Sequence, residues 1–129
     1  IVIEATDTVQ TKLMLHDGCH RLKKIFIHGA ALQYIGRVMT IIPNTSSCLR
    51  CLFLDLEESE QNQTCSRFGV SPPVVKLAGY YQAQEALSLM QNNTPKFLNK
   101  LLHFDLKKMK MRTIPIQKNS ECQLCSNKI

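Results

Sequence analysis

Four of the six cysteines in this chain form two matched Cys-x-x-Cys pairs, Cys48 with Cys51 and Cys122 with Cys125. Each pair places two thiols on one tight turn, and four thiolates together satisfy the tetrahedral coordination of a structural zinc ion. Because four sulfur ligands leave no open position for a substrate, the pattern favours a structural zinc site over a catalytic metal. Disulfides or unligated thiols are the alternatives for the same four residues.

Residues 52–121 separate the two pairs. In a compact zinc ribbon the pairs lie only roughly 15 to 20 residues apart, so the chain departs from that small motif. A metal bound here would join a central loop to the C-terminal tail across a whole substructure. Arg50, inside the first pair, would then form a local hydrogen bond or offset the charge of the thiolates.

Other polar residues have less specific interpretations. The histidines show no ligand spacing with the cysteine pairs, so helix-surface or core positions are expected for His16, His20, His28 and His103. Cys19 falls on the apolar stripe of a predicted helix and is expected to pack in the core. Glu85, an acid in a largely apolar helix, could pair with a basic group or contact a neighbouring subunit, and the sequence does not choose between these roles.

Length and apolar content limit the class of protein. The 129 residues are enough for one domain, and no apolar run approaches the ~20 residues of a membrane span. No secretory signal is recognisable. Reduced thiols in the cytoplasm therefore fit the cysteine usage better than a disulfide framework.

The charge balance is basic, with 16 Lys and Arg against 10 Asp and Glu and a formal net charge of +6. This balance permits acidic partners without requiring nucleic acid, because the five Phe and three Tyr are not interleaved with basic residues and Trp is absent. A solvated hairpin, instead of a nucleic-acid patch, is expected for the basic cluster of Lys107, Lys108, Lys110 and Arg112.

The elements that would position these residues follow an α/β pattern. Residues 1–5 are apolar enough for a buried strand with neighbours on both sides, and Thr6-Asp7-Thr8 is typical of a helix-capping cluster. A helix over 9–23 and an apolar strand over 25–28 complete the strand–helix–strand unit of parallel sheets. Gly18 inside this helix suggests close packing against another element.

The second part of the chain continues the pattern. Gly29-Ala30-Ala31 would let the backbone approach another group closely, and a third strand over 36–43 leads into the first cysteine pair. Ser71-Pro72-Pro73 opens a long helix to about Met90, because Pro is tolerated in a first turn whose amides lack partners. Residues 103–116 indicate two short strands. We therefore predict a single α/β domain over residues 1–129.

Several short motifs, taken in order, resemble one protein family. They are Thr6-Asp7, Gly29-Ala30-Ala31, Cys48-Leu49-Arg50-Cys51-Leu52-Phe53, Cys65 with Gly69-Val70, Gln82-Ala83-Gln84-Glu85-Ala86 and Cys122-Gln123-Leu124-Cys125. Each is weak alone, but the ordered set over essentially the whole chain is similar to the C-terminal half of the MoeB/ThiF/HesA adenylyltransferases, bacterial relatives of ubiquitin-activating enzymes. The resemblance implies the C-terminal part of a Rossmann-like fold, with a mixed sheet flanked by helices and a four-cysteine zinc site.

The resemblance also implies a chemistry. Family members use magnesium-ATP to adenylate the C-terminal Gly-Gly carboxylate of a ubiquitin-like sulfur-carrier protein, and sulfur transfer converts the acyl-adenylate to a thiocarboxylate. The family's glycine-rich nucleotide turn belongs to its N-terminal half, and the glycines of this chain form no G-x-G-x-x-G. We therefore expect magnesium-ATP to bind only a longer parent protein, and this chain by itself to be inactive.

Two residues carry over as candidate catalytic groups. Asp7 matches the acid near ATP and magnesium in the family's Thr-Asp-Asn motif, although Thr8 replaces the Asn and Lys12 stands where an Arg is usual. Apart from the resemblance, an acid at a strand–helix junction is usually an N-cap. Cys65 sits where several members carry a cysteine used in sulfur handling; a helix dipole could favour its thiolate, or it could be an unreactive loop cysteine. Residues 55–64 are expected to form a mobile loop that crosses over the carrier's tail.

Two functions follow from these observations. The first is the carrier-binding, zinc-holding half of an ATP-dependent adenylyltransferase of molybdopterin- or thiamine-type biosynthesis, with Asp7 and Cys65 as its catalytic residues. The second is a non-catalytic, zinc-stabilised scaffold that keeps the carrier-binding or dimerisation surface without ATP chemistry. The expected partners are the sulfur carrier and a second copy in a homodimer, with no nucleic acid and no membrane.

Overall fold

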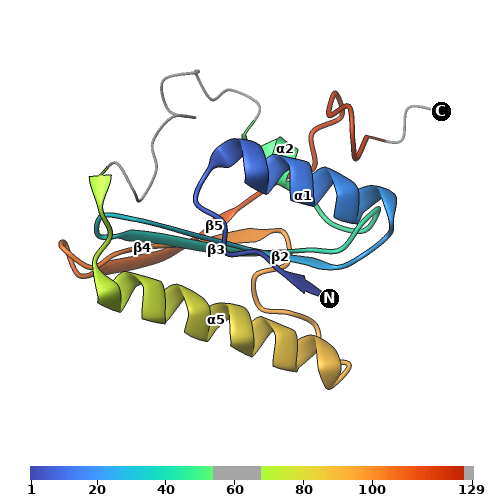
Figure 1. Cartoon of the computed structure of the whole chain (residues 1–129). Helices are drawn as coiled ribbons and strands as arrows, with labels where there is room; N and C mark the ends of the chain where they lie inside the picture. The colour runs from blue at the N-terminus through green and yellow to red at the C-terminus, as the bar shows by residue number, and fades with distance from the viewer. Residues whose placement is uncertain (54–67, 127–129) are drawn as a thin grey trace.

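A computed structural model of the chain describes residues 1–53 and 68–126, which form a mixed sheet with helices on both faces (Figure 1). The strands lie side by side in the order β1 (Val2–Ile3), β2 (Phe26–Leu32), β3 (Ile35–Ile41), β4 (Lys100–Asp105) and β5 (Lys110–Pro115). Helix α1 (Val9–Arg21) and the short α2 (Leu49–Leu52) cover one face, and α5 (Pro72–Met90) covers the other. The predicted α/β architecture with a mixed sheet is confirmed.

The first three elements form the predicted strand–helix–strand unit. β1 is parallel to β2, with Val2 opposite Phe26. Helix α1 starts after Thr8, whose side-chain oxygen accepts a hydrogen bond from the Thr11 amide at 3.2 Å and thereby satisfies one unpaired amide of the first turn. Within the described residues β1 is an edge strand, and Ile3 is 50% exposed instead of buried between two neighbours as the sequence suggested.

The remaining strands are antiparallel. β2 and β3 form one hairpin, β4 pairs with β3, and β5 pairs with β4. The two strands predicted around the basic turn are therefore confirmed, although the first of them already begins at Lys100. Helix α5 begins at Pro72 and ends at Met90 as predicted, and neither it nor any other described helix is both long and apolar enough to span a membrane.

Each face of the sheet has its own apolar core, because successive side chains of a strand point to opposite faces. The core on the α1 side contains Phe26, Met39, Ile41, Leu49 and Leu101, together with three of the paired cysteines and the half-buried Cys19. The core on the α5 side contains Ile27, Val38, Val74, Ala78, Phe97, Leu102 and Phe104. The packing role predicted for Cys19 agrees with these clusters.

Two glycines allow close contacts between layers. A Cβ atom on Gly36 would overlap the Phe104 ring, and one on Gly29 would overlap the side-chain amide of Gln82. The close approach predicted at Gly29 is therefore confirmed. The close packing expected at Gly18 is wrong, since nothing lies within 4 Å of a Cβ built there.

Candidate functional site

The two cysteine pairs meet beside helix α2. The four Sγ atoms all lie within 4.8 Å of one another, with 3.7 Å between Cys48 and Cys51, 3.6 Å between Cys48 and Cys122, and 3.3 Å between Cys51 and Cys125. Four sulfurs bound tetrahedrally to one zinc at about 2.3 Å would lie roughly 3.8 Å apart. All four are free thiols, not disulfides. The cluster has the donor type, number and spacing to hold a metal ion.

The protonation of these thiols also bears on metal binding. Burial raises the pKa of Cys48, and it raises that of Cys125 to about 12. Burial acts in the same direction on Cys122, but hydrogen bonds from the backbone amides of Cys125 and Leu124 lower its pKa to about 7. A cation among the four sulfurs would favour the thiolates, because coordination deprotonates a thiol.

Helix α1 holds the first cysteine pair in place through two contacts that the sequence did not reveal. His16 Nε2 accepts a hydrogen bond from the Leu49 amide at 3.3 Å. Asp17 pairs with Arg50, with 2.9 Å between Nε and Oδ1 and 2.5 Å between Nη2 and Oδ2. Burial lowers the pKa of His16 to about 4, so its ring is neutral and can accept this bond. Arg50 therefore hydrogen-bonds to a side chain on another helix, and not locally as one of its two expected roles had it.

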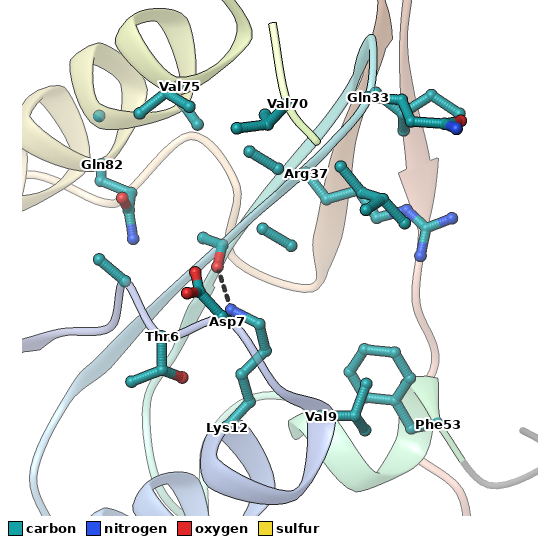
Figure 2. Close-up of a pocket in the computed structure, with 18 residues that line it drawn as sticks. Thr6, Asp7, Val9, Lys12, Gln33, Arg37, Phe53, Val70, Val75 and Gln82 are labelled. Carbon is teal, nitrogen blue, oxygen red and sulfur yellow. Dashed lines mark hydrogen bonds between the residues drawn. The ribbon is translucent and has the colours of Figure 1, made fainter. Parts of the chain in front are cut away.

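A second candidate site is a cavity of about 510 Å³ beside the C-terminal part of β2 (Figure 2). The turn that follows β1, the first turn of α1 and the first half of α5 form its walls. Its polar lining includes Thr6, Asp7, Lys12, Arg37 and Gln82. Asp7 is exposed here, and the N-cap role is taken by Thr8 instead.

A buried carboxylate fixes the turn that carries Asp7. Glu4 Oε1 accepts hydrogen bonds from the amide and the hydroxyl of Thr6, both at 2.6 Å, and from Lys12 Nζ at 2.9 Å. Its Oε2 lies 3.0 Å from Nδ1 of His28. Lys12 also donates to the Gly29 carbonyl at 2.7 Å, the bond that is dashed in Figure 2. Side chains from the segment that follows β1, from α1 and from β2 thus converge under the cavity wall.

The charges in this network follow from its geometry. Burial raises the pKa of Glu4, but the hydrogen bond with His28 and the nearby Lys12 ammonium outweigh burial and lower it to about 2. Burial lowers the pKa of His28. Glu4 is therefore ionised, and His28 is a neutral core histidine whose Nδ1–H donates to the carboxylate.

Glu85 has a different role from the two considered for it. It is buried on α5 and accepts hydrogen bonds from the Thr40 hydroxyl at 2.7 Å and from the amides of Lys96 and Phe97, both at 2.9 Å. The carboxylate satisfies backbone groups where the chain returns from α5 towards β4. Among residues 1–53 and 68–126 it pairs with no basic side chain, and it is buried instead of exposed.

The predicted site residues that the structure describes lie in two separate places, the cavity and the cysteine cluster. Asp7 lines the cavity, and the four paired cysteines lie together as the spacing suggested. Cys65 and the loop expected over residues 55–64 lie outside the described residues. The catalytic roles of Asp7 and Cys65 stay predictions. His16, Asp17 and Glu4 were missed, because no local sequence signal marks a partner that lies on another element.

Comparison with known proteins identifies one family and several similar proteins. A model of the ThiF family matches residues 1–124. The chain is 33% identical to the adenylyltransferase and sulfurtransferase MOCS3 of Aedes aegypti, over 98% of this chain and 29% of that protein. It is 32% identical to the sulfur carrier protein ThiS adenylyltransferase of Escherichia coli, over 97% of this chain and 49% of that protein.

The coverage is partial in other relatives as well. The SAMP-activating enzyme E1 of Haloferax volcanii is 30% identical over 97% of this chain and 46% of that protein. The chain thus spans less than half the length of each of these curated relatives. Among solved structures, E. coli MccB with ATP has a TM-score of 0.78 at 15% identity, over 97% of this chain and 39% of that chain. This last likeness shows the fold alone.

Proposed function

The chain belongs to the ThiF family, and from this membership we propose that it is the carrier-binding part of an ATP-dependent adenylyltransferase. The enzyme would activate the C-terminal Gly-Gly of a ubiquitin-like sulfur carrier for sulfur transfer. Relatives named as adenylyltransferases, one of them for the sulfur carrier ThiS, support the reaction class. The observation that carries the proposal is the cavity, where the exposed acid Asp7 faces a wall of small residues on β2.

The cavity suits an extended tail that lacks side chains. It is lined by β2 from Gly29 to Leu32 and by the following Gln33, and Phe53, Val70 and Val75 supply apolar walls. Asp7 offers an exposed carboxylate in this space, and it would be an oxygen ligand for magnesium. Lys12, whose ammonium is already bonded to Glu4 and to the Gly29 carbonyl, would hold the turn that presents Asp7.

The proposed reaction requires magnesium-ATP. Magnesium-ATP, when bound, supplies the adenylyl group, and among the residues of this chain we assign only Asp7 to hold it. The chain has no G-x-G-x-x-G turn to cradle phosphates. We therefore propose that residues 1–129 correspond to the C-terminal half of such an enzyme. The absence of this glycine-rich turn is also compatible with the second candidate function, a zinc-stabilised carrier-binding scaffold without ATP chemistry.

Peptide binding tests the cavity. A fluorescent peptide with the C-terminal sequence of E. coli ThiS is expected to bind the chain, and Val75→Arg, which projects a long cation into the cavity, should abolish binding. Val75 is 48% exposed, so the variant is expected to fold. Tyr80→Arg is the matched control, because Tyr80 is also exposed on α5 but does not line this cavity.

A second measurement separates the two functions. ATP–pyrophosphate exchange in the presence of the folded carrier would show adenylation by this chain itself. Binding without exchange supports a carrier-binding part or a scaffold, and exchange that appears only with a nucleotide-binding half added supports the enzyme. Failure of both the peptide and the folded carrier to bind would contradict both proposals.

A further inference from the structure

The fold arranges three basic residues in one row across the sheet. Arg37 on β3 lies opposite His103 on β4, and His103 lies opposite Arg112 on β5. Arg37 shares a sheet face with Met39, and Arg112 shares it with Ile114, both of which pack in the core on the α1 side. The three residues therefore point to the same side, and we call them the basic row.

Within the part of the chain that the structure describes, the basic row lies just beyond the positions that α1 and α2 cover. The adjacent positions Met39, Leu101 and Ile114 pack into the core beneath α1 and α2. Arg37 and His103 are half-buried, and Arg112 is exposed. Because neighbouring strands lie about 4.8 Å apart, the row extends roughly 10 Å from β3 to the sheet edge.

The row is continuous with the proposed carrier site. Arg37 lines the cavity, and Figure 2 shows its side chain extending away from Lys12 and Gln82. A tail lying in the cavity would therefore leave it beside the first residue of the row. The body of the protein that carries this tail would then lie over the row.

The row brings basic side chains together on adjacent strands. Like charges that face each other on adjacent strands repel. Burial, Arg37 and Arg112 each lower the pKa of His103, which relieves part of this repulsion. Among the described residues, neither His103 nor Arg112 forms an ion pair with a carboxylate. The carboxylate of Asp105, on the same face, instead accepts hydrogen bonds from the backbone amides of Lys107 and Lys108, at 3.0 and 3.2 Å.

We propose that the basic row docks carboxylates on the folded body of the carrier protein whose tail enters the cavity. The proposal rests on the proposed function, because the row and the cavity share Arg37. Guanidinium groups bind carboxylates through paired hydrogen bonds, and the guanidinium groups of Arg37 and Arg112, on opposite sides of His103, would select an acidic patch. The row thereby adds a specificity determinant that the short tail lacks.

The chemistry of this face favours a protein over nucleic acid. The strand positions that share the face, within 35–41, 101–105 and 110–114, hold no Phe, Tyr or Trp, and the His103 ring is the one ring among them on which a base could stack. A row of three residues is also too short to follow a nucleic-acid backbone.

The test compares a folded carrier with its isolated tail. Affinities of the chain for folded E. coli ThiS and for a peptide of its C-terminal residues are measured by fluorescence anisotropy. Arg112→Glu is expected to weaken binding of the folded carrier roughly 5- to 20-fold and to change peptide binding less than about two-fold. Lys76→Glu is the control, since it makes the same charge change on α5, across the sheet. Arg112→Ala should give a smaller loss with the same selectivity.

The outcomes separate the two proposals. Equal weakening of both probes by Arg112→Glu, or no weakening of the folded carrier, would overturn the role of the basic row while the cavity proposal stands. If neither the folded carrier nor the peptide binds the unaltered chain, both the cavity proposal and the basic-row proposal are overturned. Binding of a single-stranded RNA that Arg112→Glu abolishes, without an effect on the carrier, would reassign the row to nucleic acid.

Discussion

Glu4 is a buried charge whose oxygens are contacted from three elements. The Thr6 turn, Lys12 of α1 and His28 of β2 all bond to it at 2.6 to 3.0 Å. A buried ion pair contributes little net stability relative to an apolar replacement, but removal of one partner leaves an uncompensated charge. This network therefore acts mainly on position, since it fixes the turn that presents Asp7 to the cavity.

Acid should destabilise the fold through Glu4. Its pKa is about 2 in the folded chain, against 4.5 for the unperturbed group. A lowered folded pKa gives stability that is fully present above the unfolded value and is lost as the pH falls through the folded value. We therefore expect urea unfolding to report a loss on the order of 3 kcal/mol between about pH 6 and pH 2.

Glu4→Gln is the control for this pH dependence. The variant leaves Lys12 buried without its counter-charge and should be less stable by about 3 to 5 kcal/mol at pH 7. Most of the stability loss in acid should be absent from this variant. The remainder would come from Asp17: burial raises its pKa, but Arg50 and His16 outweigh burial and lower it. An unchanged pH dependence would show that Glu4 is not its source.

Glycine substitutions form a second test at single residues. Gly36→Ala places a methyl group against the Phe104 ring and should cost about 1 to 3 kcal/mol. Gly18→Ala should instead be neutral or stabilise by up to about 1 kcal/mol, because it lies inside α1 with open space around its Cβ position. Thermal melting of both variants checks this, and equal effects would contradict the packing described at Gly36.

Among the elements, α1 links the two candidate sites. Its first turn carries Lys12 into the cavity network, and its third turn carries His16 and Asp17 to α2. Helix α2 is only one turn long and spans Leu49–Leu52, so it cannot be stable by itself. The geometry of the first cysteine pair therefore depends on α1.

His16→Ala should loosen the cysteine cluster. The Leu49 amide would lose its acceptor in a buried place, at a cost of about 1 to 3 kcal/mol, and the chain should release zinc faster to a chromophoric chelator. His103→Ala is the control, because His103 is paired in the sheet and does not contact α2. Equal rates of zinc release would contradict the positioning role of α1.

On the scale of the whole molecule, the cysteine cluster joins distant parts of the chain. Cys48 and Cys51 stand between β3 and α5, whereas Cys122 and Cys125 follow the last strand. A metal here would close the chain over the α1 side of the sheet and hold the tail after β5. Such a link stabilises the folded state by the free energy of metal binding.

Loss of one ligand should therefore release the metal and the tail. We expect Cys125→Ser to lose bound zinc and to lower the melting temperature by more than about 5 °C. Metal content and thermal unfolding are measured together. Cys19→Ser is the control, because Cys19 packs in the core outside the cluster. Unchanged zinc and melting temperature in Cys125→Ser would refute a structural metal.

The sequence by itself determined the elements and the cysteine cluster. The strand–helix–strand start and α5 could be predicted from neighbouring residues, because apolar runs, the capping cluster Thr6-Asp7-Thr8 and the prolines that open α5 are all local signals. The cysteine pairs were recognisable because two thiols on one turn have a fixed spacing. The family was recognisable because ordered short motifs keep their spacing along the chain, and the family model over residues 1–124 agrees.

Only the tertiary structure decided which side chains from different elements meet. Glu4 and His28 lie 24 positions apart and His16 and Leu49 lie 33 apart, so no local period connects them. The basic row depends on strand register, because a shift of one residue would send Arg112 to the opposite face. Register and layer packing are set by the sum of many weak contacts, and these exist only in the folded chain.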